Sequence, residues 1–136
     1  NGFMVGKQAE QSAIIKRGAE LIQAISCSQL KKITLMINNS YGAGNYAMCG
    51  RAFKPSFLWS CPNATTAVMG GAQALQVLSD LKNPAANSPE SFITNFEHQS
   101  SVLYTSANLW DDGVIDPAST KEILTHSLLA ITENLT

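Results

Sequence analysis

The sequence NNSYGAGNYAMCGR, at residues 38–51, decides how this chain folds. A short apolar run, ITLMI at residues 33–37, leads into it, and the glycine-spaced sequence GAG occupies residues 42–44. A strand, a tight glycine turn and a helix start in this order can direct backbone N–H groups at a negatively charged oxygen. The segment therefore predicts an anion-binding backbone, although a purely structural tight turn also explains the two glycines.

The composition sets the size and character of the fold. A chain of 136 residues is long enough for one domain with a hydrophobic core and short for two. Hydrophobic residues make up 45% of the chain and charged residues only 14%. This balance favours a chain that buries much of its surface, against other subunits or against another domain.

Several classes of protein are disfavoured. The net charge of −1 and the scattering of the nine basic residues argue against nucleic-acid binding. No apolar run approaches the roughly 20 residues that a membrane-spanning helix needs. Three cysteines without CxxC spacing and two histidines favour neither a disulfide framework nor a metal site.

The hydrophobic pattern predicts alternating helices and strands. A helix is predicted over residues 8–27, and Gly18 on its apolar face, which costs about 1 kcal/mol relative to alanine, predicts close packing there. The uninterrupted apolar run at residues 33–37 predicts a strand buried on both faces, as in α/β proteins. A loop is predicted at residues 82–89. The remaining predicted elements are strands at 57–59 and 64–69, a short apolar step at 114–115, and helices at 46–52, 72–81, 88–99 and 117–135.

The residue types needed for side-chain catalysis are not arranged in a recognisable pattern. His98 and His126 fall in helical segments, and the chain contains no GxSxG sequence. Asp111 and Asp112 are adjacent in a predicted turn, so their carboxylates should diverge and cap the turn rather than form a catalytic pair. Packing or surface roles are therefore predicted for the two histidines, and turn capping for the two aspartates.

Several blocks together resemble the carboxyltransferase β subunit of biotin-dependent acyl-CoA carboxylases, with the methylcrotonoyl-CoA carboxylase branch most similar. They follow the family order over nearly the whole chain. The blocks are GFMVG at 2–6, KITL at 32–35, SYGAGNY at 40–46, MCGRA at 48–52, PNA at 62–64, VMGG at 68–71 and WDDGVIDP at 110–117. The resemblance implies an α/β fold of the ClpP/crotonase-like ββα superhelix type. It also implies that residues 1–136 are the C-terminal part of a C-terminal carboxyltransferase domain, as a single domain or fragment.

The resemblance implies transfer of a carboxyl group from carboxybiotin to an acyl-CoA, most like 3-methylcrotonoyl-CoA. Biotin would be carried by the α subunit, and other β subunits would complete the active site in a homo-oligomer. No metal is implied in this segment, and the fragment alone would be inactive because the acyl-CoA half of the site is missing. The implied compartment is the mitochondrial matrix or the bacterial cytoplasm. A biotin-dependent acyl-CoA decarboxylase subunit and a non-catalytic crotonase-fold interaction domain remain as alternatives.

The matching blocks also imply a site built from backbone. The N–H groups of Ala43 and Gly44, with Gly42 in the turn, would form one side of an oxyanion hole, and the loop at residues 3–6 would form the other. One such donor is worth about 2.7–4 kcal/mol of transition-state stabilisation. The residues implied on the biotin side are Phe3, Val5, Gly6, Tyr41 and Tyr46.

Overall fold

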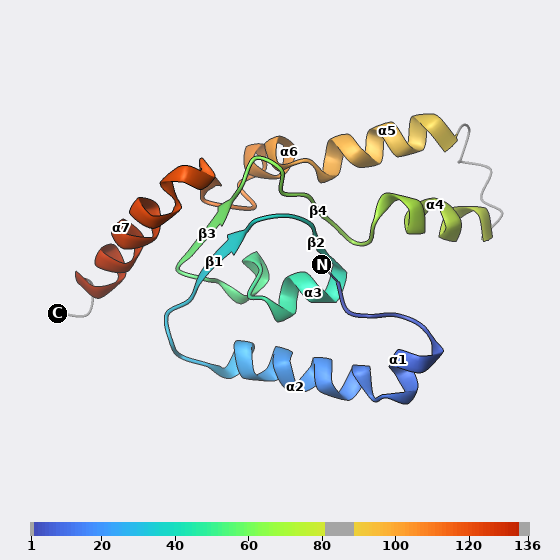
Figure 1. Ribbon diagram of the computed structural model, residues 1–136, viewed down its shortest axis with the longest axis horizontal. Coiled ribbons are helices and arrows are strands. Elements are labelled where there is room, and N and C mark those ends of the chain that lie inside the picture. Colours follow the sequence, from blue (N-terminus) through green and yellow to red (C-terminus); the bar gives the residue numbers. More distant parts are fainter. Residues whose placement is uncertain (1, 81–88, 134–136) are drawn as a thin grey trace.

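Two small parallel sheets lie at the centre of the structure (Figure 1). The computed structural model describes residues 2–80 and 89–133. One sheet has the order β1 (Ile33–Met36), β3 (Phe57–Ser60) and β5 (Gly113–Val114), and the other pairs β2 (Ser40–Tyr41) with β4 (Thr66–Ala67). All three strand pairings are parallel, which confirms the predicted α/β class.

The middle strand, β3, carries the core. Leu58 is only 1% exposed and packs in one cluster with Met36, Ala64 and Val102. The prediction that residues 33–37 would be buried on both faces is wrong for this chain, since Met36 is the only buried residue of β1. The described elements cover the faces of β1 only in part, so that Ile33, Thr34 and Leu35 are half-buried.

The predicted helix at residues 8–27 is two helices, α1 (Lys7–Gln11) and α2 (Ile14–Cys27). Ala13 lies between them with a φ of 61°, a left-handed conformation that no α-helix can continue through. The close packing predicted at Gly18 is confirmed, because a Cβ there would lie 3.2 Å from the Phe3 ring.

The central helix begins earlier than predicted. The structure has α3 (Gly42–Ala47) and a separate 3-10 turn, η1 (Arg51–Phe53), in place of one helix at residues 46–52. The glycine turn is itself the first helical turn, and Cys49, with a φ of 61°, ends the helix. The Thr34 hydroxyl donates to the Cys49 carbonyl oxygen at 2.9 Å, which ties this break to β1.

The other helices surround the sheets. They are α4 (Gly71–Asp80), α5 (Pro89–Ser100), α6 (Val102–Ala107) and α7 (Thr120–Glu133), with the 3-10 turn η2 (Pro117–Ser119) before α7. The predicted strand at residues 64–69 is reduced to the two residues of β4, α6 is a helix that the pattern did not predict, and the loop predicted at residues 82–89 lies almost wholly outside the described residues.

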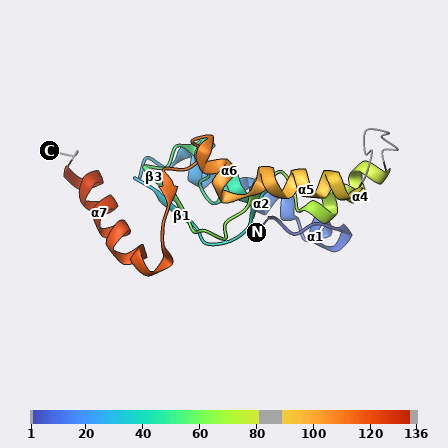
Figure 2. The same ribbon diagram turned by 90° about the horizontal axis from the view of Figure 1, so that it is seen from above.

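The molecule is elongated, with α7 at one end and the α4–α5 pair at the other (Figures 1 and 2). The Asp116 carboxylate accepts a hydrogen bond from the Ala118 N–H at 2.9 Å, and Pro117 follows it. This confirms the predicted helix-start signal, although it caps η2 rather than α7 directly. The two sheets therefore lie between α7 at one end of the molecule and the α4–α5 pair at the other.

Candidate active site

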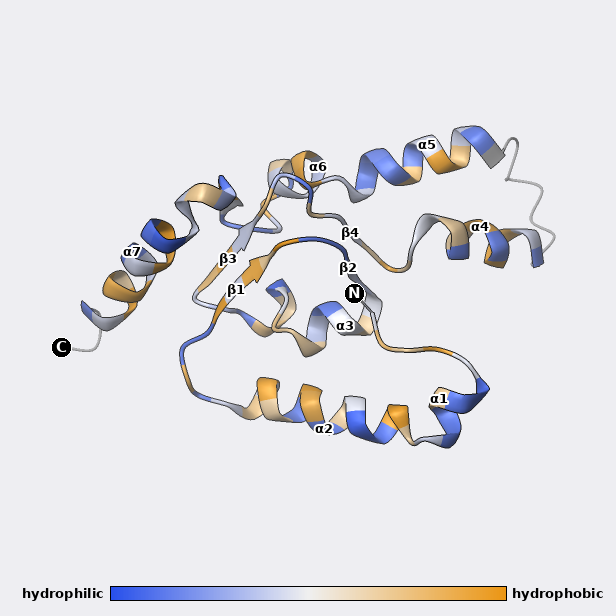
Figure 3. Cartoon of the chain, in the orientation of Figure 1, coloured by the Kyte–Doolittle hydropathy of each residue, from blue (hydrophilic) through white to orange (hydrophobic). Residues whose placement is uncertain are grey.

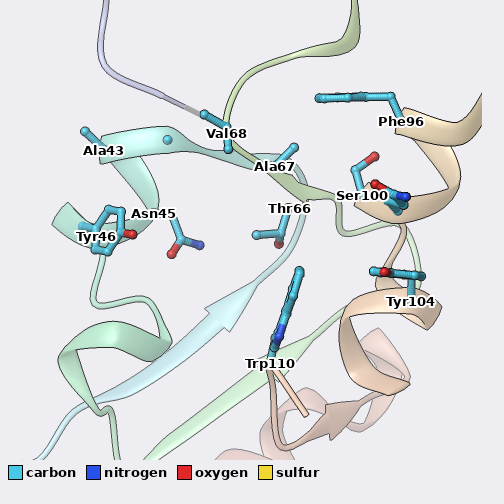
Figure 4. A pocket seen from close by; sticks show the side chains of 12 residues that line it. Ala43, Asn45, Tyr46, Thr66, Ala67, Val68, Phe96, Ser100, Tyr104 and Trp110 are labelled. Carbon is cyan, nitrogen blue, oxygen red and sulfur yellow. The ribbon is translucent and has the colours of Figure 1, made fainter. Parts of the chain in front are cut away.

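A cavity of about 620 Å³ opens beside the second sheet, where α3, β4, α5 and α6 meet (Figure 4). We call it the main cavity. Gly42, Ala43 and Tyr46 of α3 line one side, and Phe96 and Tyr104 of α5 and α6 line another. None of its lining residues is an Asp, Glu, Lys, Arg or His. The cavity therefore suits an uncharged, flat group that is held by aromatic contacts and by neutral hydrogen-bond donors and acceptors.

The glycine turn can present backbone donors to this cavity. The first N–H groups of a helix have no carbonyl partner inside the helix, and the start of α3 has no side-chain cap. Ala43 lies at the cavity, whereas Gly44 is buried in the same turn. The amide of Asn45 donates to the Ser40 hydroxyl at 2.9 Å and so ties α3 to β2. These features make the α3 start the best-placed group of backbone donors in the main cavity.

Gly42 is required by the backbone. Its φ is +53°, and a Cβ at this position would lie 2.8 Å from the Val68 carbonyl oxygen. Tyr41, in the extended conformation, precedes it and ends β2. The short pairing of β2 with β4 therefore brings Val68 and the start of α3 to the same edge of the main cavity.

The other residues implied on the biotin side do not line this cavity. The Phe3 ring packs over Gly18 on α2, Val5 is 91% exposed, and Gly6 precedes α1 with a φ of 113°. The hydroxyl of Tyr41 lies 3.3 Å from that of Thr65. Of the eight implied residues, the main cavity thus gathers Gly42, Ala43 and Tyr46, while a second wall from residues 3–6 stays a prediction.

Three aromatic residues of the site have no role in the sequence prediction. Phe96, Tyr104 and Trp110 line the main cavity, and the rings of Tyr104 and Trp110 meet edge to face at 6.2 Å. The sequence predicted that Phe96 lies in a helix, but nothing local indicated that it would face α3. Only knowledge of how α5 and α6 pack beside β4 could have identified these residues.

The two adjacent aspartates diverge, as predicted. The Asp112 carboxylate pairs with the Arg51 guanidinium at 2.7 Å and accepts a hydrogen bond from the Leu58 N–H at 2.7 Å. Asp111 is 4% exposed and accepts a hydrogen bond from the Ser60 hydroxyl at 2.7 Å. Neither carboxylate lines the main cavity, so neither is placed for acid–base catalysis there.

Asp112 is held in its ionised form. Partial burial by itself raises the pKa of its carboxyl group, but the hydrogen bonds from Arg51 and the Leu58 N–H, with the guanidinium charge, outweigh it. The net effect is a pKa below the ordinary value of 3.8. The carboxylate is therefore charged and clamped throughout the neutral range.

Two absences among the described residues bear on the class of site. Within residues 2–80 and 89–133, no group of three or more His, Cys, Asp or Glu side chains could hold a metal ion. Over the same residues, the helices are too short or too polar to cross a bilayer.

Comparison with known proteins identifies the family. The chain matches the carboxyl transferase domain over residues 1–135. It is 42% identical to the probable mitochondrial methylcrotonoyl-CoA carboxylase beta chain of Drosophila melanogaster, over 98% of this chain and 25% of that protein. It is 45% identical to the biotin-dependent 3-methylcrotonyl-coenzyme A carboxylase beta1 subunit of Mycobacterium tuberculosis, over 90% of this chain and 26% of that protein.

A solved structure of a related protein has the same fold as this chain. The crystal structure of the P. aeruginosa geranyl-CoA carboxylase beta subunit superposes with a TM-score of 0.83 and 44% identity, covering 93% of this chain and 26% of that one. The predicted crotonase-like fold is thereby confirmed. The chain spans about a quarter of the length of these relatives. The parallel sheets and the glycine turn at the start of α3 are both features of a chain with this fold. The chain belongs to the carboxyl transferase domain family.

Proposed function

We propose that this chain supplies the biotin-side half of a carboxyltransferase site in a biotin-dependent acyl-CoA carboxylase. The observation that carries the proposal is the main cavity, where the start of α3 meets an aromatic, uncharged lining. A neutral bicyclic ureido ring fits such a lining better than a charged nucleotide would, because a buried charge without a partner is costly.

The proposed chemistry needs no titrating side chain from this chain. When bound, carboxybiotin would supply the carboxyl group, and its ureido nitrogen would be the acceptor for the proton that the acyl-CoA loses. The chain itself holds the ring between aromatic walls and directs the N–H groups of Ala43 and Gly44 at a developing negative charge. Because such donors are fixed before the reaction, each is worth about 2.7–4 kcal/mol without any titrating residue.

The full enzyme extends beyond this segment. We infer that residues 1–136 are the C-terminal part of a carboxyltransferase domain and that the acyl-CoA half of the site lies in another β subunit of a homo-oligomer. The biotin-carrying α subunit is the expected partner, and the compartment is a mitochondrial matrix or a bacterial cytoplasm, where relatives occur. An isolated segment of this length would be inactive.

The acyl group is proposed from the relatives. Two of them are named for methylcrotonoyl-CoA and one for geranyl-CoA, so a branched, unsaturated acyl-CoA is the expected substrate, most like 3-methylcrotonoyl-CoA. A panel of acyl-CoA thioesters, tested with the full-length protein and a biotinylated carrier, checks this. If no acyl-CoA in the panel gives a carboxylated product, the proposed function is wrong.

A matched pair of variants tests the site. Ala43→Phe should fill the main cavity beside the α3 donors and lower carboxyl transfer by about 100-fold. Ala43→Ser keeps the N–H and the small volume at this exposed position, so it should retain most of the activity. Unchanged function in Ala43→Phe would favour the alternative of a non-catalytic interaction domain. Faster decarboxylation of a carboxylated acyl-CoA than its formation would favour the decarboxylase alternative.

A further inference from the structure

The indole of Trp110 forms a wall of the main cavity. In Figure 4 its ring points upward between Thr66 and Tyr104, across the cavity from α3. Trp110 also lines a smaller cavity of about 180 Å³, which shares Asn45, Tyr46 and Thr66 with the main one. The ring therefore stands at the boundary between the two spaces, and its position sets the width of both.

The backbone that carries Trp110 is fixed on its amino side. The backbone N–H of Trp110 donates to the Thr105 carbonyl oxygen at 3.0 Å. Leu109, the residue before it, has a left-handed φ of 60°. A non-glycine residue in this region costs roughly 1 kcal/mol or more, so the turn needs bonds that hold it.

The two aspartates provide those bonds on the carboxyl side. Asp111 bonds to Ser60, whose exposure is 0%, and Asp112 makes a reciprocal pair of bonds with the backbone of Leu58. The N–H of Asp112 donates to the Leu58 carbonyl oxygen at 2.8 Å, while its carboxylate accepts from the Leu58 N–H at 2.7 Å. The two residues that follow Trp110 are thus bonded to β3, the most buried strand.

The Arg51–Asp112 ion pair joins the two walls. Arg51 opens η1, shortly after α3, and lines the smaller cavity together with Trp110. Its two guanidinium nitrogens lie 2.7 and 3.3 Å from the two oxygens of the Asp112 carboxylate. This two-point contact fixes orientation as well as distance between the α3–η1 side and the Trp110 side.

We propose that Asp111 and Asp112 are positioning residues that hold Trp110 as a fixed wall for the ring bound in the main cavity. This rests on the proposed function, since it assumes that the ring is biotin. Their carboxylates do not contact the ligand, and they act through the indole. A loosened indole would weaken binding of the ring while the α3 donors stay in place.

A double-mutant cycle on the full-length enzyme tests the proposal. The variants are Trp110→Phe, Asp112→Asn and the two combined, with Asp116→Asn as a matched control at the exposed cap of η2. The readout is carboxyl transfer from a carboxylated acyl-CoA to free biotin. Trp110→Phe and Asp112→Asn should each raise the apparent KM for biotin by about tenfold and change kcat by less than about twofold. Asp116→Asn should leave both constants unchanged.

The combined variant decides whether Asp112 acts through the ring. If it does, the double variant should raise the KM no more than the larger single change, because the two residues serve one interaction. Additive effects would overturn the proposal, and so would a loss of thermal stability in Asp112→Asn with an unchanged KM.

A second measurement separates this inference from the proposed function. In protein labelled with 5-fluorotryptophan, the fluorine resonance that is absent from Trp110→Phe belongs to Trp110. Asp112→Asn should shift or broaden that resonance, while Asp116→Asn should not. A resonance that Asp112→Asn leaves unmoved overturns the positioning role even in an active enzyme. A moving resonance in a protein without carboxyl transfer supports the positioning role and contradicts the proposed function.

Discussion

The strand β3 and the helix α7 both carry large apolar residues, but the surroundings of these residues are very different. Of the four residues of β3, Leu58 is 1% exposed and Ser60 is 0% exposed. Among the fourteen residues of α7, Ser127 alone is buried, and Leu128 and Leu129 are 56% and 52% exposed. Figure 3 shows hydrophobic residues, in orange, along α7 at the end of the molecule opposite α4 and α5.

This difference indicates which element of the chain holds the cavity walls in place. A parallel strand lies on each side of β3, and two aspartates bond to it from the Trp110 turn. The main side-chain link of α7 to the sheet is the Trp59 indole N–H, which donates to the Ser127 hydroxyl at 3.0 Å. The cavity walls are therefore attached to the short, buried strand and not to the long helix.

Truncation of the β3 core should have the largest effect. Leu58→Ala removes the most buried large side chain and leaves a cavity among Met36, Ala64 and Val102. The expected loss in the free energy of unfolding is about 2–5 kcal/mol. Urea denaturation followed by circular dichroism measures it. A loss below about 1 kcal/mol would mean that β3 is not the anchor of the fold.

The stability that Asp112 gives to the fold through the Trp110 turn should depend on pH. The pKa of Asp112 is lower in the folded chain than its ordinary value of 3.8, so its ionised form stabilises the fold. That contribution is complete above this value and is lost as the pH falls through the folded pKa. At neutral pH, Asp112→Asn should therefore be less stable than the wild type by about 1 kcal/mol.

Denaturation curves at a series of pH values check this expectation. The difference in unfolding free energy between wild type and Asp112→Asn should shrink as the pH falls below 3.8. Asp116→Asn is the control, because asparagine caps a helix start about as well as aspartate does. A difference that stays constant with pH would show that the ionised carboxylate does not stabilise the fold.

The exposed face of α7 should give the smallest effect. Leu128→Ala changes a side chain that is already more than half exposed, so the unfolding free energy of this chain should fall by roughly 0.5 kcal/mol. The same change in the assembled oligomer should cost more if another subunit covers this face. Equal losses of unfolding free energy in Leu128→Ala and Leu58→Ala would contradict the contrast between α7 and β3.

Local signals in the sequence predicted the features that depend on neighbouring residues. The Asp116–Pro117 helix start and the packing at Gly18 are of this kind, as is the α/β class. The matched blocks also indicated Gly42, Ala43 and Tyr46, which the cavity brings together. The helix start and the packing at Gly18 follow from residue type and short spacing, whereas the three cavity residues were implied by the resemblance to the family.

Long-range contacts account for what the sequence did not predict. The bonds of Asp112 reach Leu58 and Arg51, which are distant in the chain, and nothing near Asp112 indicates either partner. The left-handed conformations of Ala13 and Cys49, which end two helices early, occur at residues that ordinarily favour right-handed backbone. Their position reflects packing in the folded chain rather than local preference.

The parallel register has a consequence for the order of folding. Ile33 pairs with Phe57, but Trp59 pairs with Gly113 across a much longer stretch of chain. Because closing a longer loop costs more entropy, β1 and β3 can join before β5 docks. The Trp110 turn directly precedes β5, so the main cavity lacks its Trp110 wall until that strand docks. We therefore expect a chain in which β5 has not yet docked to hold a ligand in the main cavity less well than the complete fold does.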